Sequence, residues 1–138
     1  MTLERYARYW ETLQPATVGE LRALATDDLL FRDPFNEVRG VERVMALLRH
    51  MFASLERPVF VVRHMAQAEA VGFIRWDFTC AARGRALAIE GVSEIHLAAE
   101  GRIAAHLDHW DAASQVYARI PLLGGVLQQV RKRLAMPG

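Results

Sequence analysis

The sequence has little cysteine, no long apolar run and almost no net charge, and each of these absences excludes a class of protein. Cys80 is the single cysteine, so the chain can form no internal disulfide and no metal site built from several cysteines, which fits a reducing cytoplasm. No stretch approaches the roughly 20 apolar residues that a membrane-spanning helix needs. The 17 basic and 16 acidic residues nearly cancel, so we expect no binding to nucleic acid.

Two kinds of sequence signal are also missing. The first ten residues, MTLERYARYW, carry charge where a signal peptide needs an apolar run, so we expect no export signal and a cytoplasmic protein. The glycine-containing stretches AARGRA and LLGGV lack the pattern of a phosphate-binding loop. We therefore expect no nucleotide-phosphate site of that kind.

What the chain does have is an apolar fraction of 52% over 138 residues, which suits one domain with a sizeable core. Apolar residues at helical spacing predict three helices, in residues 3–13, 17–25 and 41–57. Thr17 and Glu20 are expected to form a capping box at the start of the second helix.

The pattern changes after residue 58, where β-branched residues and alternation of polar and apolar side chains become common. VFVVRHM favours a strand, and three long strands are predicted at about 69–82, 86–98 and 102–110, joined by the turns ARGR and AEGR. The sequence thus predicts an α+β fold, in which the helices pack on one face of a curved antiparallel sheet.

Residues 112–138 are expected to add a helical extension to this single domain. Asp111 can cap a short helix, and Pro121 opens a final amphipathic segment that contains the basic run RKR. That segment could lie on an anionic membrane surface. We favour packing on the domain, with the basic residues solvated near a helix C-terminus.

Successive side chains of a strand point to opposite faces of the sheet, and this alternation gives the first indication of a cavity. Trp76 and Phe78 share a face with Cys80, and this face is predicted to be buried. On the last strand, an inward Trp110 brings Asp108 and His106 inward too. Buried charge is costly, so these two side chains form either a pair or part of a wet pocket. They lack a third ligand nearby, so we expect no metal site.

Asp33 lies in the string FRDPF, between Phe31 and Phe35, and permits two interpretations. An aspartate before proline is an ordinary turn residue. A carboxylate held against an apolar cavity could instead act as a general base, if donors are aimed at the charge that develops.

The strings RYWETL, LATDDLLFRDP and EGVSEIHLAAEGRIAAHLDHWD, in this order over residues 3–111, resemble the nuclear-transport-factor-2-like superfamily. The similarity is to its branch of ketosteroid isomerases and SnoaL-like polyketide cyclases. The resemblance implies a cone, in which a strongly curved sheet wrapped by three helices encloses an apolar pocket. It also implies a homodimer that forms through the sheet.

The same resemblance implies roles for individual residues. Asp33 falls at the position of the isomerase base and Tyr9 at that of the tyrosine that donates to the enolate oxygen. Ser93 stands where a second donor, a carboxylic acid, is found in the isomerases, and Leu48 where they carry a supporting tyrosine. Asp108 resembles the acidic residues that cyclases and epoxide hydrolases of the superfamily use on late strands.

Our first hypothesis is therefore cofactor-free proton transfer on a small apolar carbonyl compound, as in an isomerase, with Asp33 as base and Tyr9 and Ser93 as donors. The expected apolar walls are Phe31, Phe35, Trp76, Phe78 and Trp110. SnoaL-like cyclisation or epoxide hydrolysis centred on Asp108 and His106 remains an alternative. So does a non-catalytic protein that binds a hydrophobic ligand or acts through its dimer surface.

Overall fold

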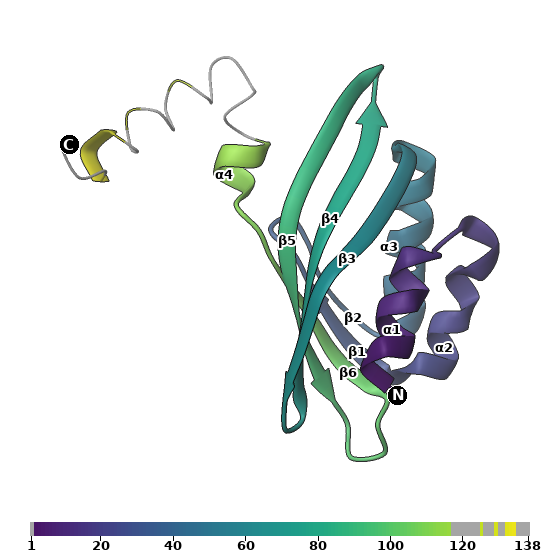
Figure 1. Ribbon diagram of the computed structural model, residues 1–138. Helices are drawn as coiled ribbons and strands as arrows, with labels where there is room; N and C mark the ends of the chain where they lie inside the picture. The colour runs from purple at the N-terminus through teal and green to yellow at the C-terminus, as the bar shows by residue number, and fades with distance from the viewer. Residues whose placement is uncertain (1, 117–124, 126–128, 130–131, 135–138) are drawn as a thin grey trace.

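Three helical segments and two strands precede a four-strand meander in the computed structural model, which describes residues 2–116, 125, 129 and 132–134 (Figure 1). The helical segments are α1 (Thr2–Glu11), η1 (Pro15–Glu20) with its continuation α2 (Leu21–Leu24), and α3 (Val41–Ser54). The strands are β1 (Ala25–Arg32), β2 (Glu37–Arg39), β3 (Glu56–Ala68), β4 (Val71–Ala82), β5 (Arg85–Leu97) and β6 (Ile103–His109).

The strands form one curved sheet in the order β2-β1-β6-β5-β4-β3. The meander from β3 to β6 is antiparallel, and β2 pairs antiparallel with β1. One pairing differs, because β1 runs parallel to β6. Helices α1, α2 and α3 lie together on one side of the sheet (Figure 1). The α+β fold and the three predicted long strands are confirmed, and β1–β6 is the parallel pairing that the sequence pattern did not predict.

The core lies between these helices and the inner face of the sheet. Tyr6 on α1, Met45 on α3, and Ile95 and Ile103 on adjacent strands have no exposed surface. Burying an aliphatic side chain of this size stabilises the fold by about 1.5–3 kcal/mol. Such residues fix the helices against the sheet and so position the side chains of α1 and β6 that meet in the interior.

The start of the second helical segment differs from the prediction. The predicted capping box of Thr17 and Glu20 is wrong, because Thr17 is bonded to Gln14 and not to Glu20. Its Oγ1 accepts the N–H of Gln14 at 3.0 Å and donates to the Gln14 carbonyl at 3.1 Å. The segment begins at Pro15 as a 3₁₀ helix. Proline is well suited to a first helical position, since its missing N–H would have no partner there.

The end of the third helix also lies earlier than the sequence indicated. Gly40 precedes α3 as predicted, but the helix ends at Ser54, and Pro58 lies inside β3. This strand is at the edge of the sheet, where a residue without an N–H is tolerated. The register is irregular between Glu56 and Val59, next to the proline.

The structure describes the start of the predicted C-terminal extension and a few separate residues after it. Helix α4 (Ala112–Gln115) follows Asp111, whose carboxylate accepts the N–H of Ser114 at 3.0 Å, as expected for a cap. The final segment from Pro121 lies mostly outside the described residues. No helix in the described part of the chain is long and apolar enough to cross a membrane.

Candidate functional site

A cavity of about 370 Å³ lies between α3 and the inner face of the sheet and opens to solvent. Small-molecule sites in proteins have volumes of roughly 300–1,000 Å³ and mostly apolar linings. The aromatic side chains that line this cavity are Trp10, Phe31, Phe35, Phe60, Trp76, Phe78 and Trp110. Two carboxylates, Asp33 and Asp108, share the lining. The cavity thus brings together two acidic residues that lie far apart in the sequence.

His106 is the centre of a buried hydrogen-bond network beside this cavity. It is 3% exposed, and its Nδ1 lies 2.7 Å from the hydroxyl of Tyr6 on α1. Its Nε2 lies 2.7 Å from Oδ1 of Asp108. His106 and Asp108 are two residues apart on β6, so both side chains point to the same face of the strand. The conditional prediction that they turn inward together is confirmed.

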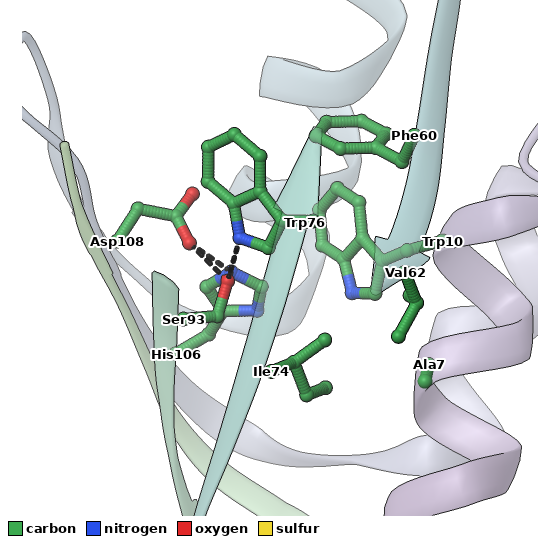
Figure 2. Close-up of a pocket in the computed structure, with 9 residues that line it drawn as sticks. All are labelled: Ala7, Trp10, Phe60, Val62, Ile74, Trp76, Ser93, His106 and Asp108. Atoms are coloured by element: carbon green, nitrogen blue, oxygen red, sulfur yellow. Dashed lines mark hydrogen bonds and ion pairs between the residues drawn. The ribbon is translucent and has the colours of Figure 1, made fainter. Parts of the chain in front are cut away.

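Ser93 joins the network from the neighbouring strand, where it is directly opposite Asp108 in the register of β5 and β6. Its hydroxyl donates to Asp108 Oδ1 at 2.5 Å and accepts the indole N–H of Trp76 at 2.8 Å. Figure 2 shows one oxygen of Asp108 turned toward Ser93 and His106 and the other turned away from them. Within the described part of the chain, no hydrogen bond reaches that second oxygen, Oδ2. Asp108 therefore has one fixed oxygen and one available oxygen.

The burial of Tyr6 is consistent with one arrangement of hydrogen-bond donors in the network. Burial raises the pKa of Tyr6 well above its ordinary value, against a smaller lowering effect of the Trp10 indole. The neutral phenol can donate to His106 Nδ1, and the Nε2–H of the ring then donates to Asp108. This tautomer gives each of the three groups a complementary partner.

A small recess of about 20 Å³ adjoins the network (Figure 2). The indole of Trp10 lines both the recess and the larger cavity. In the described part of the chain, the Trp10 Nε1 is the buried side-chain nitrogen without a hydrogen bond of ordinary geometry, although the indole is close enough to Tyr6 to lower the pKa of its phenol. An unpaired buried donor costs about 1–3 kcal/mol, so its position beside the cavity is a departure from ordinary core packing.

Asp33 agrees with both interpretations that the sequence left open. Its Oδ1 accepts the backbone N–H groups of Phe35 at 2.8 Å and Asn36 at 2.7 Å, as in an ordinary turn. The side-chain amide of Asn36 also donates to it, at 3.2 Å. Asp33 is nonetheless part of the cavity lining, at its more exposed end.

The two predicted donors are placed differently from the expectation. The hydroxyl of Tyr9 donates to the backbone carbonyl of Val18 at 2.9 Å, and this residue does not line the cavity with Asp33. The hydroxyl proton of Ser93 is used by Asp108. The hydroxyl proton of Tyr9 is thus used by Val18 and that of Ser93 by Asp108, and the oxyanion-donor role of Tyr9 stays a prediction.

Tyr6 is the residue of the network that sequence reasoning missed. It lies on the same helix as Tyr9, three residues earlier, and both side chains are buried. The sequence contained no signal that separates them, because the partner of each hydroxyl is set by the arrangement of η1 and β6 around the helix.

The five predicted wall residues all line the cavity. Phe31, Trp76 and Phe78 are buried, whereas Phe35 is 52% exposed and Trp110 is half-buried at the opening. The rings of Phe35 and Trp110 meet edge to face, with centroids 5.5 Å apart. Among the described residues, no three His, Cys, Asp or Glu side chains are grouped so that they could hold a metal ion.

Comparison with known proteins gives matches in sequence and in structure. The sequence model of the SnoaL-like domain matches residues 6–106. A proposed SnoaL-like polyketide cyclase from Jannaschia sp. CCS1 is 17% identical, with a TM-score of 0.71 over 82% of this chain and 87% of that chain. An LEH-like epoxide hydrolase of M. tuberculosis is 19% identical, with a TM-score of 0.67 over 95% of this chain and 93% of that chain. At such identities the structural likeness establishes the fold.

A third similar structure is a protein with a ketosteroid isomerase-like fold from Catenulispora acidiphila, which was solved in complex with trimethylamine. It is 14% identical, with a TM-score of 0.70 over 83% of this chain and 88% of that chain. No curated protein matches the sequence.

Proposed function

Because the chain belongs to the SnoaL-like domain family, within the nuclear-transport-factor-2-like superfamily, we propose that it is a small-molecule enzyme in which Asp108 transfers protons. The observation that carries this proposal is the unequal use of the two oxygens of Asp108. Oδ1 is held by Ser93 and His106, and Oδ2 is available at an apolar cavity. A general base needs this combination of a fixed orientation and a free lone pair.

Each member of the network supports the carboxylate in a different way. Tyr6 sets the tautomer of His106, and the ring then directs an N–H at Asp108. Trp76 donates to Ser93 and so leaves the serine proton for Asp108. With His106 in the tautomer described above, these donors orient the carboxylate without giving it a cationic partner. The aromatic walls exclude bulk water from the group that reacts.

The positions of the donors favour one reaction class over the other. An isomerase mechanism at Asp33 needs hydrogen bonds to an enolate oxygen, and losing one such donor costs roughly 2.7–4 kcal/mol of barrier. Tyr9 and Ser93, the two donors expected for it, use their protons elsewhere. We therefore favour reactions centred on Asp108 and His106, namely proton abstraction for ring closure or activation of water for epoxide opening. The substrate is a small, largely apolar molecule.

The proposal is tested with a probe that reports a general base without knowledge of the substrate. The base removes the ring C–H proton of 5-nitrobenzisoxazole, the N–O bond breaks, and a coloured phenolate forms. Turnover in Asp108→Asn should fall by roughly 10²–10⁴-fold relative to wild type, the usual contribution of such a base. Hydrolysis of styrene oxide, measured in parallel, shows whether the same carboxylate also activates water.

Three further measurements complete this test. Asp27→Asn removes an exposed carboxylate on β1 and should keep wild-type turnover. If Asp33→Asn abolishes turnover and Asp108→Asn does not, the base is Asp33, and isomerisation of a β,γ-unsaturated 3-ketosteroid becomes the reaction to measure. If no probe is turned over by wild type but a neutral aromatic ligand quenches tryptophan fluorescence, the cavity binds ligands without catalysis.

A further inference from the structure

The described lining of the cavity contains two carboxylates, Asp33 and Asp108, and no lysine or arginine that could neutralise them. His50 is the basic side chain of the lining, and it is exposed and lies 3.3 Å from the hydroxyl of Ser54. Arg32, the residue before Asp33, pairs with Glu37 at 3.6 Å. Among the residues that the structure describes, a ligand therefore meets an apolar cavity with acidic groups and no opposing arginine or lysine.

The contacts of Asp33 orient its carboxylate and leave its charge in place. The backbone N–H groups of Phe35 and Asn36 and the amide of Asn36 are all neutral donors. They hold Oδ1 most closely, whereas Oδ2 has one long contact, 3.4 Å from the Asn36 amide. Asp33 thus presents a fixed anionic group at the exposed end of the cavity.

Two aromatic rings lie at the same end. The backbone N–H of Phe35 donates a hydrogen bond to the Asp33 carboxylate. Its ring packs edge to face with the ring of Trp110, with centroids 5.5 Å apart. Phe35 is 52% exposed, which is unusual for a ring that lines a cavity. The face of an aromatic ring attracts a cation, with tryptophan the strongest, and quaternary ammonium groups are recognised in this way.

We propose that Asp33, Phe35 and Trp110 form a subsite for an organic ammonium group at the mouth of the cavity. The substrate or ligand of this protein is accordingly an amine or quaternary ammonium compound, with an apolar body that extends toward Asp108. This inference rests on the proposed function only in taking the Asp108 cavity as the place where the substrate binds. Asp33 then serves recognition, and Asp108 serves chemistry.

Electrostatics separates this ligand class from the two others that the cavity could take. An anionic ligand would meet two carboxylates, and like charges in apolar surroundings repel strongly. A neutral apolar ligand would cover Asp33 and remove water from the carboxylate without giving it a partner, which is costly. An ammonium group replaces that lost water with an opposite charge and with contact to the aromatic rings at the mouth of the cavity.

The test uses a pair of ligands that differ in charge alone. Benzyltrimethylammonium and neopentylbenzene have the same shape, with a nitrogen in one replaced by a carbon in the other. By calorimetry, wild type should bind the cation at least roughly tenfold more tightly than the neutral compound. Asp33→Asn keeps an oxygen for the turn and removes the charge, so it should abolish most of this preference. Phe35→Leu should weaken binding of the cation more than binding of the neutral ligand. Asp27→Asn, the control, should bind both ligands as wild type does.

Several outcomes would overturn the inference. One is equal affinity of wild type for the two ligands. Another is a preference for the cation that survives in Asp33→Asn and disappears in Asp108→Asn, which would place the cation at the deep end. The proposed function and this inference can fail independently of each other. Loss of turnover in Asp108→Asn with retained cation binding supports both proposals. Turnover by wild type without any preference for the cation removes this inference alone.

Discussion

Tyr6 and Tyr9 show how much depends on the partner of one hydroxyl group. Both are buried on α1, and their rings stack with centroids 6.4 Å apart. The hydroxyl of Tyr6 meets His106, and that of Tyr9 meets the carbonyl of Val18. Spacing within one helix contains no information about which distant group each side chain reaches.

Tyr6→Phe should lower kcat for 5-nitrobenzisoxazole by roughly tenfold, with little change in KM. Without the Tyr6 proton, His106 can adopt the other tautomer, and the N–H that orients Asp108 is lost. Steady-state kinetics measures this effect. Tyr9→Phe, a change of the same size on the same helix, should leave kcat unchanged, and equal losses in both variants would contradict a positioning role for Tyr6.

Tyr6→Phe should also change how the stability of the protein depends on pH in alkaline solution. Burial raises the pKa of Tyr6 above its ordinary value of 10.0, so the folded protein keeps a proton that the unfolded chain loses. Stability is therefore complete below pH 10 and should fall above it, by about 1.4 kcal/mol per pH unit from this residue. Tyr6→Phe should remove this contribution in urea titrations at several alkaline pH values. Burial also raises the pKa of Tyr9, so part of the slope should remain.

At the scale of the element, β4 was predictable because alternation is a local property. Trp76, Phe78 and Cys80 are all buried, as period two indicated. The inward direction of His106 and Asp108 on β6 followed from the same rule once Trp110 was assumed to point inward. The parallel pairing of β1 with β6 was not predictable in this way, since strand neighbours are set by packing across the whole chain.

Strand β5 contains a glycine that the site requires. Gly91 is opposite Trp76 in the register of β4 and β5, and a Cβ at this position would lie 2.5 Å from two carbons of the indole ring. The missing side chain leaves room for the indole whose N–H reaches Ser93. A close approach of the ring to the strand, rather than a turn, explains this glycine.

Gly91→Ala should destabilise the protein by roughly 1–3 kcal/mol, the usual cost of overpacking a core, because the indole of Trp76 must move. Urea denaturation measures the change in the free energy of unfolding. Gly19→Ala is a matched control, since its Cβ would meet Arg22 at an ordinary 3.7 Å. Unchanged stability in Gly91→Ala would show that the indole has other space to occupy.

At the scale of the whole molecule, the outer face of the sheet exposes apolar side chains. Val59, Val61 and Phe73 on β3 and β4 are exposed by 45%, 37% and 41%. Exposed apolar groups on one face are a common feature of surfaces that bind another protein. The exposed apolar residues of the outer face lead us to propose that two copies of the chain pair through this face.

Light scattering should give the mass of a dimer for wild type, and Val61→Glu should shift it toward the monomer. A charge buried without a partner is costly, so the variant should dissociate at higher concentration than wild type. Ala46→Glu, on the exposed side of α3, places the same charge away from the sheet and should leave the mass unchanged. A monomeric wild type would contradict this proposal.

The parallel pairing of β1 with β6 has a consequence for the chain as it is synthesised. Strand β1 is complete at Arg32, but the strand that covers its edge begins at Ile103. Until β6 has left the ribosome, the edges of β1 and β5 that it will join have no partner and can pair with other chains. Contacts this distant in sequence also slow folding. The network that holds Asp108 is therefore among the last parts to form, and a nascent chain that stops before β6 exposes two open edges and has no site.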